Sequence, residues 1–173
     1  MITKMKKQAY NPYLPSYEYV PDGEPYVFGD RLYVYGSHDK FNGDTFCVND
    51  YVCWSAPVDD LGDWRYEGVI FKSEQDPLTK GKNTVMNAPD VERGQDGRYY
   101  LFYQLAMQKV ISVAVAEEPW GPFAFYGHIR HPDGMLYGQK KGDAYNFDPS
   151  VFTMKQAKRK FRNICVKMKK LTN

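Results

Sequence analysis

Two segments of this chain repeat the same order of turn and strand signals, and this repeat restricts the possible folds more than any other feature. In the first segment, Gly29-Asp30 precedes an aromatic run at residues 31–35, and in the second, Asp96-Gly97 precedes a similar run at residues 98–103. A tight Gly/Asp turn followed by an aromatic strand is typical of a β-hairpin, because glycine readily adopts the positive φ that such turns require.

Each aromatic run is followed by two more predicted strands, at residues 51–55 and 64–70 in the first unit and at 111–115 and 123–129 in the second. Each unit therefore contains about four short strands, and the pattern recurs after roughly 60 residues. A β-sandwich also has many short strands, but the shared order of turn, aromatic strand and Trp/Phe-x-x-x-Gly strand favours the four-stranded blades of a β-propeller. We predict an all-β fold of the propeller class.

The repeat stops within a third unit. Its start, residues 144–153, contains Asn146 and Phe147-Asp148-Pro149, but residues 154–173 contain no glycine, tyrosine or acid. We therefore expect an N-terminal extension at 1–10, an incomplete propeller at 11–153 and a basic tail at 154–173. Within the propeller, blade one spans about 11–72 and blade two about 85–131. Since closed propellers have about four to eight blades, we expect the isolated chain to fold poorly or aggregate.

Charge and composition exclude several classes of protein. Residues 155–173 carry eight Lys and Arg and no acid, whereas the rest of the chain carries 15 Lys and Arg and 21 Asp and Glu. A basic arm binding nucleic acid is an open alternative, but the tail has no defined motif, so we predict no nucleic-acid partner.

No apolar run approaches the roughly 20 residues of a membrane span, and no signal peptide is visible, so we expect a soluble, cytoplasmic protein without a membrane partner. The three cysteines have no metal-ligand spacing, and we predict neither metal nor cofactor.

An aspartate lies near the start of each unit: Asp22 before the first, Asp90 in the second and Asp148 in the third. The innermost strands of propeller blades converge at one end of the central channel, so these acids are expected to meet there. Convergent carboxylates are suited to glycosidic bond cleavage, in which one acid protonates the leaving oxygen and another activates water. The alternative for each is a turn aspartate that bonds its own backbone.

These motifs together resemble glycoside hydrolase family 43 over residues 11 to about 153. Asn11-Pro12-Tyr13-Leu14, Pro21-Asp22 and residues 27–39 are similar to the opening blade of that family. Ala88-Pro89-Asp90-Val91 with residues 96–100 is similar to the second blade, and residues 147–152 are similar to the start of the third.

The resemblance implies a five-bladed propeller that hydrolyses arabinofuranosyl or xylosyl linkages of plant cell-wall polysaccharides or oligosaccharides, such as those of xylan, with inversion. By this resemblance Asp22 matches the general base, and Asp148 matches the acid that tunes the pKa of the proton donor. That donor is a Glu from a later blade, which no residue of this chain matches, so we expect the chain alone to be inactive. Asp90 and, from the rim, His38 are expected to contact substrate.

Several alternatives remain open at this point. They are a carbohydrate-binding half-propeller without catalysis, and five-bladed relatives that act on fructans or that phosphorolyse mannosides. The oligomeric state is not predicted.

Overall fold

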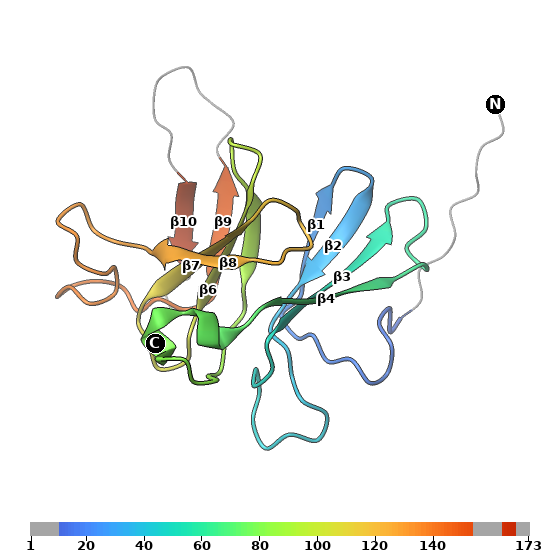
Figure 1. The fold of residues 1–173 in the computed structure, drawn as a ribbon, viewed down its shortest axis with the longest axis horizontal. Helices are drawn as coiled ribbons and strands as arrows, with labels where there is room; N and C mark the ends of the chain where they lie inside the picture. Colours follow the sequence, from blue (N-terminus) through green and yellow to red (C-terminus); the bar gives the residue numbers. More distant parts are fainter. Residues whose placement is uncertain (1–10, 154–163, 169–173) are drawn as a thin grey trace.

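The computed structural model describes residues 11–153 and 164–168 and contains two antiparallel four-stranded sheets (Figure 1). The first sheet has the order β1 (Glu24–Phe28), β2 (Arg31–Tyr35), β3 (Tyr51–Pro57) and β4 (Arg65–Phe71). The second repeats this order with β5 (Asp90–Arg93), β6 (Tyr99–Gln104), β7 (Ile111–Ala116) and β8 (Ala124–His128). The predicted all-β class is confirmed, and we call these two sheets blade one and blade two.

Local chemistry explains why the two blades share their form. In blade one, Phe28 pairs with Arg31 across a two-residue turn in which Gly29 has a φ of 65°. The pairing of the last two strands shifts register at the same place in each blade, and a glycine of the last strand lies beside the shift: Gly68 pairs with Cys53, and Gly127 pairs with Val113. Bulges increase the local twist of a sheet, so the two blades share this irregularity as well as their strand order.

The blades pack face to face around one aromatic core. Phe28 of β1 lies edge-on to Tyr99 of β6, with ring centroids 4.9 Å apart. Tyr35 of β2 is fully buried, and the buried Leu101 and Tyr103 of β6 belong to the same cluster. Alternate residues of a strand point to opposite faces, which leaves the other face of blade two for the next unit.

A third unit begins beside blade two. Strand β9 (Pro149–Thr153) packs against β5 and β6, and its buried Val151 contributes to a second cluster with Phe102 and Val113. Strand β10 (Ile164–Met168) pairs with β9 in antiparallel fashion. This strand lies within the segment 154–173 that was predicted to be a basic tail. The predicted extension at 1–10 and the remainder of the tail lie outside the described residues.

A linker with two short 3-10 helices, η1 (Ser73–Gln75) and η2 (Pro77–Thr79), joins the two blades. Its buried Asp76 accepts hydrogen bonds from the Leu78 amide and from the Tyr103 hydroxyl of blade two, each 2.8 Å long. Within the described residues, neither helix is long enough to span a bilayer.

Candidate active site

The first strands of the three units are neighbours, and each begins at one of the predicted aspartates. Asp22 lies two residues before β1, Asp90 is the first residue of β5, and Asp148 immediately precedes β9. Because β1, β5 and β9 start at the same end of the sheets, the fold brings these three segments together at that end (Figure 1).

Asp22 is exposed, and its turn is held by the segment that follows β2. The Ser37 hydroxyl, fully buried, lies 3.2 Å from both Oδ2 of Asp22 and the carbonyl oxygen of Pro21, so its single proton is shared between these acceptors. A Cβ at Gly36 would lie only 2.7 Å from the Pro21 oxygen. Glycine at position 36 therefore permits the close approach that lets Ser37 reach the carboxylate.

Asp148 repeats the backbone conformation of Asp22 at the equivalent place in the third unit. The φ of Asp22 is 55° and that of Asp148 is 46°, both in the left-handed region that residues other than glycine seldom adopt. Such conformations cost free energy and are concentrated at functional sites. The side chain of Asp148 is half-buried.

A buried thiol lies close to both acids. Burial raises the pKa of Cys47, and the negative charges of Asp39, Asp22 and Asp148 raise it further, so the thiol is neutral beside the carboxylates. Burial also raises the pKa of Tyr51, to which Asp148 adds. Cys47 is thus influenced by the charges of both Asp22 and Asp148, although these acids are 126 residues apart in the sequence.

Asp90 has a different environment from the other two acids. It is only 2% exposed; Oδ1 accepts a hydrogen bond from the Tyr26 hydroxyl of β1, and Oδ2 accepts one of 2.5 Å from the Val151 amide of β9. Burial raises the pKa of this carboxyl, and the two hydrogen bonds oppose the rise. Both oxygens thus join the first strands of the three units, and a contact of Asp90 with substrate stays a prediction.

His38, for which a substrate contact from the rim also stays a prediction, is bound within the protein on both sides of its ring. Its Nδ1 lies 2.9 Å from the carbonyl oxygen of Asp50, and its Nε2 lies 2.8 Å from Glu18. The other oxygen of Glu18 accepts a hydrogen bond from the Trp54 indole at 2.9 Å. Both ring nitrogens are therefore engaged within blade one, and neither is left for a sugar hydroxyl.

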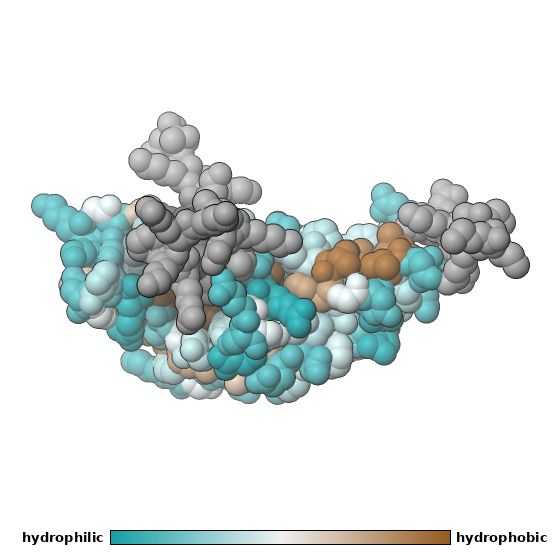
Figure 2. All heavy atoms as spheres, turned by 90° about the horizontal axis from the view of Figure 1, so that it is seen from above, coloured by the Kyte–Doolittle hydropathy of each residue, from teal (hydrophilic) through white to brown (hydrophobic). Residues whose placement is uncertain are grey.

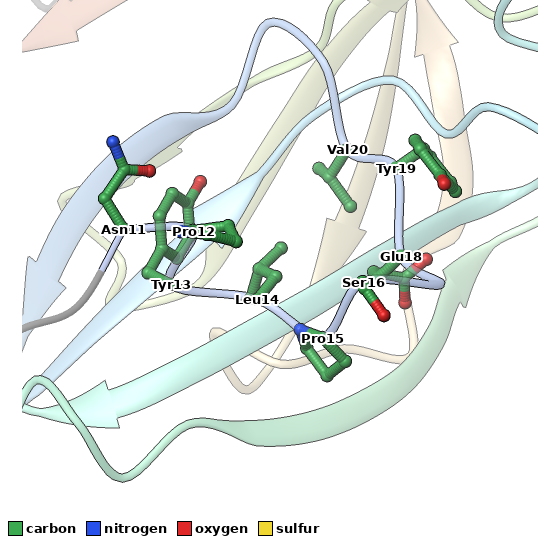
Figure 3. Close-up of a pocket in the computed structure, with 9 residues that line it drawn as sticks. All are labelled: Asn11, Pro12, Tyr13, Leu14, Pro15, Ser16, Glu18, Tyr19 and Val20. Carbon is green, nitrogen blue, oxygen red and sulfur yellow. The ribbon is translucent and has the colours of Figure 1, made fainter.

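Residues 11–20 curve around a surface hollow of about 400 Å³, shown in Figure 3. Its walls are mainly proline, tyrosine and leucine side chains, and its one carboxylate is that of Glu18. That carboxylate already accepts a hydrogen bond from Trp54 and contacts His38, so it holds neighbouring parts of blade one together at the edge of the hollow.

Sequence reasoning did not identify Ser37, Cys47 or Glu18. A signal for Ser37 existed in Gly36-Ser37 directly after an aromatic strand, because a small residue at such a point often permits a close backbone approach. Cys47 and Glu18 lie in loops without a local motif, and their contacts depend on how the loops fold.

The described glutamates do not identify a proton donor for this pair of acids. Glu18 is engaged as above, and Glu67 accepts hydrogen bonds from Ser55 and Arg65. Glu117 and Glu118 lie in the connection between β7 and β8, at the opposite end of blade two. The general acid stays a prediction for a Glu of a later blade.

Comparison with known proteins gives a consistent result. The sequence profile of glycosyl hydrolases family 43 matches residues 15–161, eight residues past the point where the repeat was predicted to stop. A xylosidase/arabinosidase of Thermoclostridium stercorarium is 55% identical over 163 residues, which are 94% of this chain and 34% of that protein. Xylosidase/arabinosidase 43A of Humicola insolens is 32% identical over 78% of this chain and 40% of that protein.

Solved structures agree with these sequence matches. An α-L-arabinofuranosidase of Clostridium thermocellum superposes with a TM-score of 0.55 and 28% identity, over 77% of this chain and 44% of that one. A β-xylosidase superposes with a TM-score of 0.57 and 28% identity, over 80% of this chain and 41% of that one. The chain thus spans about a third to two fifths of the length of the curated relatives that it matches.

Proposed function

Because this chain belongs to glycosyl hydrolases family 43, we propose that it carries the water-activating half of an inverting glycoside hydrolase site that acts on arabinofuranosyl or xylosyl linkages of hemicellulose. The observation that supports this proposal is a pair of aspartates, Asp22 and Asp148, that precede β1 and β9. Both have a backbone in the left-handed region, and the charges of both raise the pKa of the buried Cys47 thiol. The names of the relatives, xylosidase/arabinosidase, support the choice of sugars.

The two acids have different environments, and this suits them to different roles. Asp22 is exposed and receives a hydrogen bond from Ser37, so its carboxylate can accept a proton from an attacking water. Asp148 is half-buried, and its negative charge would raise the pKa of a proton donor brought near it. In an inverting site, base and donor lie about 6.5–9.5 Å apart, so that water enters on the face opposite the leaving group.

A substrate with an activated leaving group tests the base without the missing donor. Dinitrophenolate leaves without protonation, so 2,4-dinitrophenyl β-D-xyloside needs water activation but not a general acid. The expected inactivity of the chain for lack of a proton donor concerns glycosides whose leaving group needs protonation. We therefore expect the chain to hydrolyse the dinitrophenyl xyloside faster than buffer does, to release α-xylose first by proton NMR, and to show no comparable acceleration with an alkyl xyloside. The 2,4-dinitrophenyl α-L-arabinofuranoside tests the other sugar in the same way.

The matched variants are Asp22→Asn and Asp30→Asn. Asp30 is also exposed, but it lies in the β1–β2 turn at the other end of the strand. Asp22→Asn should abolish the acceleration with an unchanged circular dichroism spectrum, whereas Asp30→Asn should retain it. Equal rates in Asp22→Asn and the wild type would refute the role of Asp22.

A carbohydrate-binding half-propeller without catalysis is the second candidate, favoured by the lack of a matching proton donor in this sequence. It predicts binding of xylo- or arabino-oligosaccharides in calorimetry with no acceleration of dinitrophenyl glycoside hydrolysis. The two measurements together therefore separate the candidates.

A further inference from the structure

The loop between β2 and β3, residues 36–50, presents two phenylalanines to solvent. Phe41 is 71% exposed and Phe46 is 63% exposed, although phenylalanine is among the residues most often buried. In Figure 1 this loop extends from the end of blade one at which β1 begins and β2 ends. The exposed rings therefore lie on the side of the molecule that holds Asp22.

Hydrogen bonds within the loop keep it in one shape. The His38 carbonyl oxygen accepts a bond of 3.1 Å from the Asn49 amide, which closes the base of the loop. Oδ1 of Asp39 accepts a bond of 2.5 Å from the Cys47 amide, and the Asn49 side chain donates one of 2.9 Å to the Asp39 carbonyl oxygen. A loop fixed in this way loses little conformational entropy when a ligand binds its side chains.

The ring of Phe41 is held by a second aromatic residue. It stacks on Tyr19, with ring centroids 5.8 Å apart and planes inclined by 26°. The Tyr19 carbonyl oxygen accepts a hydrogen bond of 2.9 Å from the Asp39 amide, which fixes the backbones of the pair relative to each other. Since Phe41 remains 71% exposed, one face of its ring is covered by Tyr19 and the other is available.

Both ends of this loop contact the site that holds the acids. At its start, Ser37 donates a hydrogen bond to Asp22. At its other end, Cys47 directly follows Phe46, and its thiol lies in the electrostatic field of Asp22 and Asp148. The exposed rings are therefore carried by a hydrogen-bonded loop whose start contacts Asp22 through Ser37.

We propose that the Tyr19–Phe41 pair and Phe46 form a stacking platform for a sugar ring of the substrate chain that lies outside the cleavage position. The C–H faces of a pyranose are apolar and weakly positive, and they complement the negative face of an aromatic ring. The relatives are named xylosidase/arabinosidase, so the chain that we propose for this platform is a xylan-type oligosaccharide. This inference rests on the proposed function of the acids and adds to it a preference for longer chains.

The test compares ligands of different length by isothermal titration calorimetry with the whole chain. We expect the wild type to bind xylopentaose more tightly than xylobiose. Stacking contacts of this kind predict that Phe41→Ala weakens xylopentaose binding by about three- to tenfold, and that the loss is larger for xylopentaose than for xylobiose. Phe46→Ala should act in the same direction, and Phe41→Tyr should restore the affinity.

Tyr126→Ala is the matched control, because Tyr126 is 59% exposed on β8 and lies outside the loop. It should leave the affinity for xylopentaose unchanged, and circular dichroism should show all variants folded. The platform would be overturned if Phe41→Ala and Phe46→Ala bound xylopentaose as tightly as the wild type does, or if the wild type bound xylopentaose and xylobiose equally. In either case the dinitrophenyl xyloside assay would still test Asp22 separately. Absence of binding to either ligand, together with no xyloside hydrolysis, would overturn both proposals.

Discussion

Three aspartates occupy equivalent places in the repeat, yet their side chains have different surroundings. Asp22 is exposed and Asp148 is half-buried, and the backbone of each is in the left-handed region. Asp90 is buried between two hydrogen-bond donors. Equivalent positions in the repeat therefore predict that each aspartate lies near the start of the first strand of its unit, but they do not predict what each carboxylate contacts. At the scale of the residue, function depends on which donors reach the carboxylate.

Ser37→Ala should lower the rate of the hydrolysis that depends on Asp22 without unfolding the protein. The variant removes the side-chain donor that reaches Asp22, and a lost hydrogen bond to an ionised group predicts a decrease of about tenfold in kcat for dinitrophenyl xyloside, with little change in KM. Steady-state kinetics measures this split. Ser16→Ala, in the exposed segment before β1, is the control and should behave like the wild type. An unchanged kcat in Ser37→Ala would show that Asp22 is positioned by other contacts.

Asp90→Asn should destabilise the fold. An amide nitrogen replaces one of the two acceptor oxygens. If the amide oxygen stays with the Val151 N–H, the Tyr26 hydroxyl can only accept from the new NH2 group and its own proton loses its acceptor; in the other orientation the Val151 N–H faces a donor. An unsatisfied buried group of this kind lowers the free energy of unfolding by about 1–3 kcal/mol. Urea denaturation measures it, with Glu92→Gln, on the same strand and less buried, as the control that should stay near the wild type.

The pH dependence of stability provides a second test of Asp90. Burial raises its pKa in the folded state above the ordinary value of 3.8, so between these two pKa values the folded protein binds more protons than the unfolded chain. The contribution of Asp90 to the free energy of unfolding therefore falls as the pH rises through this window. Urea titrations should show this fall in the wild type and not in Asp90→Asn. The same pH profile in both proteins would contradict a raised pKa for Asp90.

At the scale of the element, the site depends on two segments of blade one that approach closely. Gly36→Ala would place a Cβ 2.7 Å from the Pro21 carbonyl oxygen and from the side chain of Val20, so the turn that carries Asp22 must move. A displacement of this kind predicts a loss of about tenfold to 100-fold in kcat. Gly127→Ala is the control, because a Cβ there meets no atom within 4 Å and its φ is not positive. Full activity in Gly36→Ala would mean that the close approach is not required.

Most strands could be predicted from local signals, whereas β10 could not. Turn glycines and alternating aromatic residues mark β2 and β6, because a hairpin and a half-buried face require them. Strand β10 has neither signal, and its pairing with β9 provides its hydrogen bonds. The contact between His38 and Glu18 escaped prediction for a similar reason, since it joins two loops rather than two repeated positions.

At the scale of the whole molecule, the two faces of blade one differ in burial. One face is buried against blade two in the aromatic core. The opposite face contains the cross-strand pairs Pro25–Val34 and Val27–Leu32, and a hollow of about 260 Å³ lies over it, lined also by Tyr13 and Trp64. Figure 2 shows an apolar patch over the part of the molecule that contains blade one. Exposed apolar surfaces of this kind promote association.

Val27→Lys should therefore reduce self-association of the chain. Val27 is 58% exposed on β1, so a lysine there places a charge on the apolar face at little cost to the fold. Sedimentation velocity over a range of concentrations should show association in the wild type and a shift towards monomer in Val27→Lys. Met107→Lys introduces the same charge at a side chain that is 92% exposed in the loop after β6, away from this face, and should associate like the wild type. If both variants shift equally, net charge and not this face controls association; if neither shifts, the contacts lie elsewhere on the molecule.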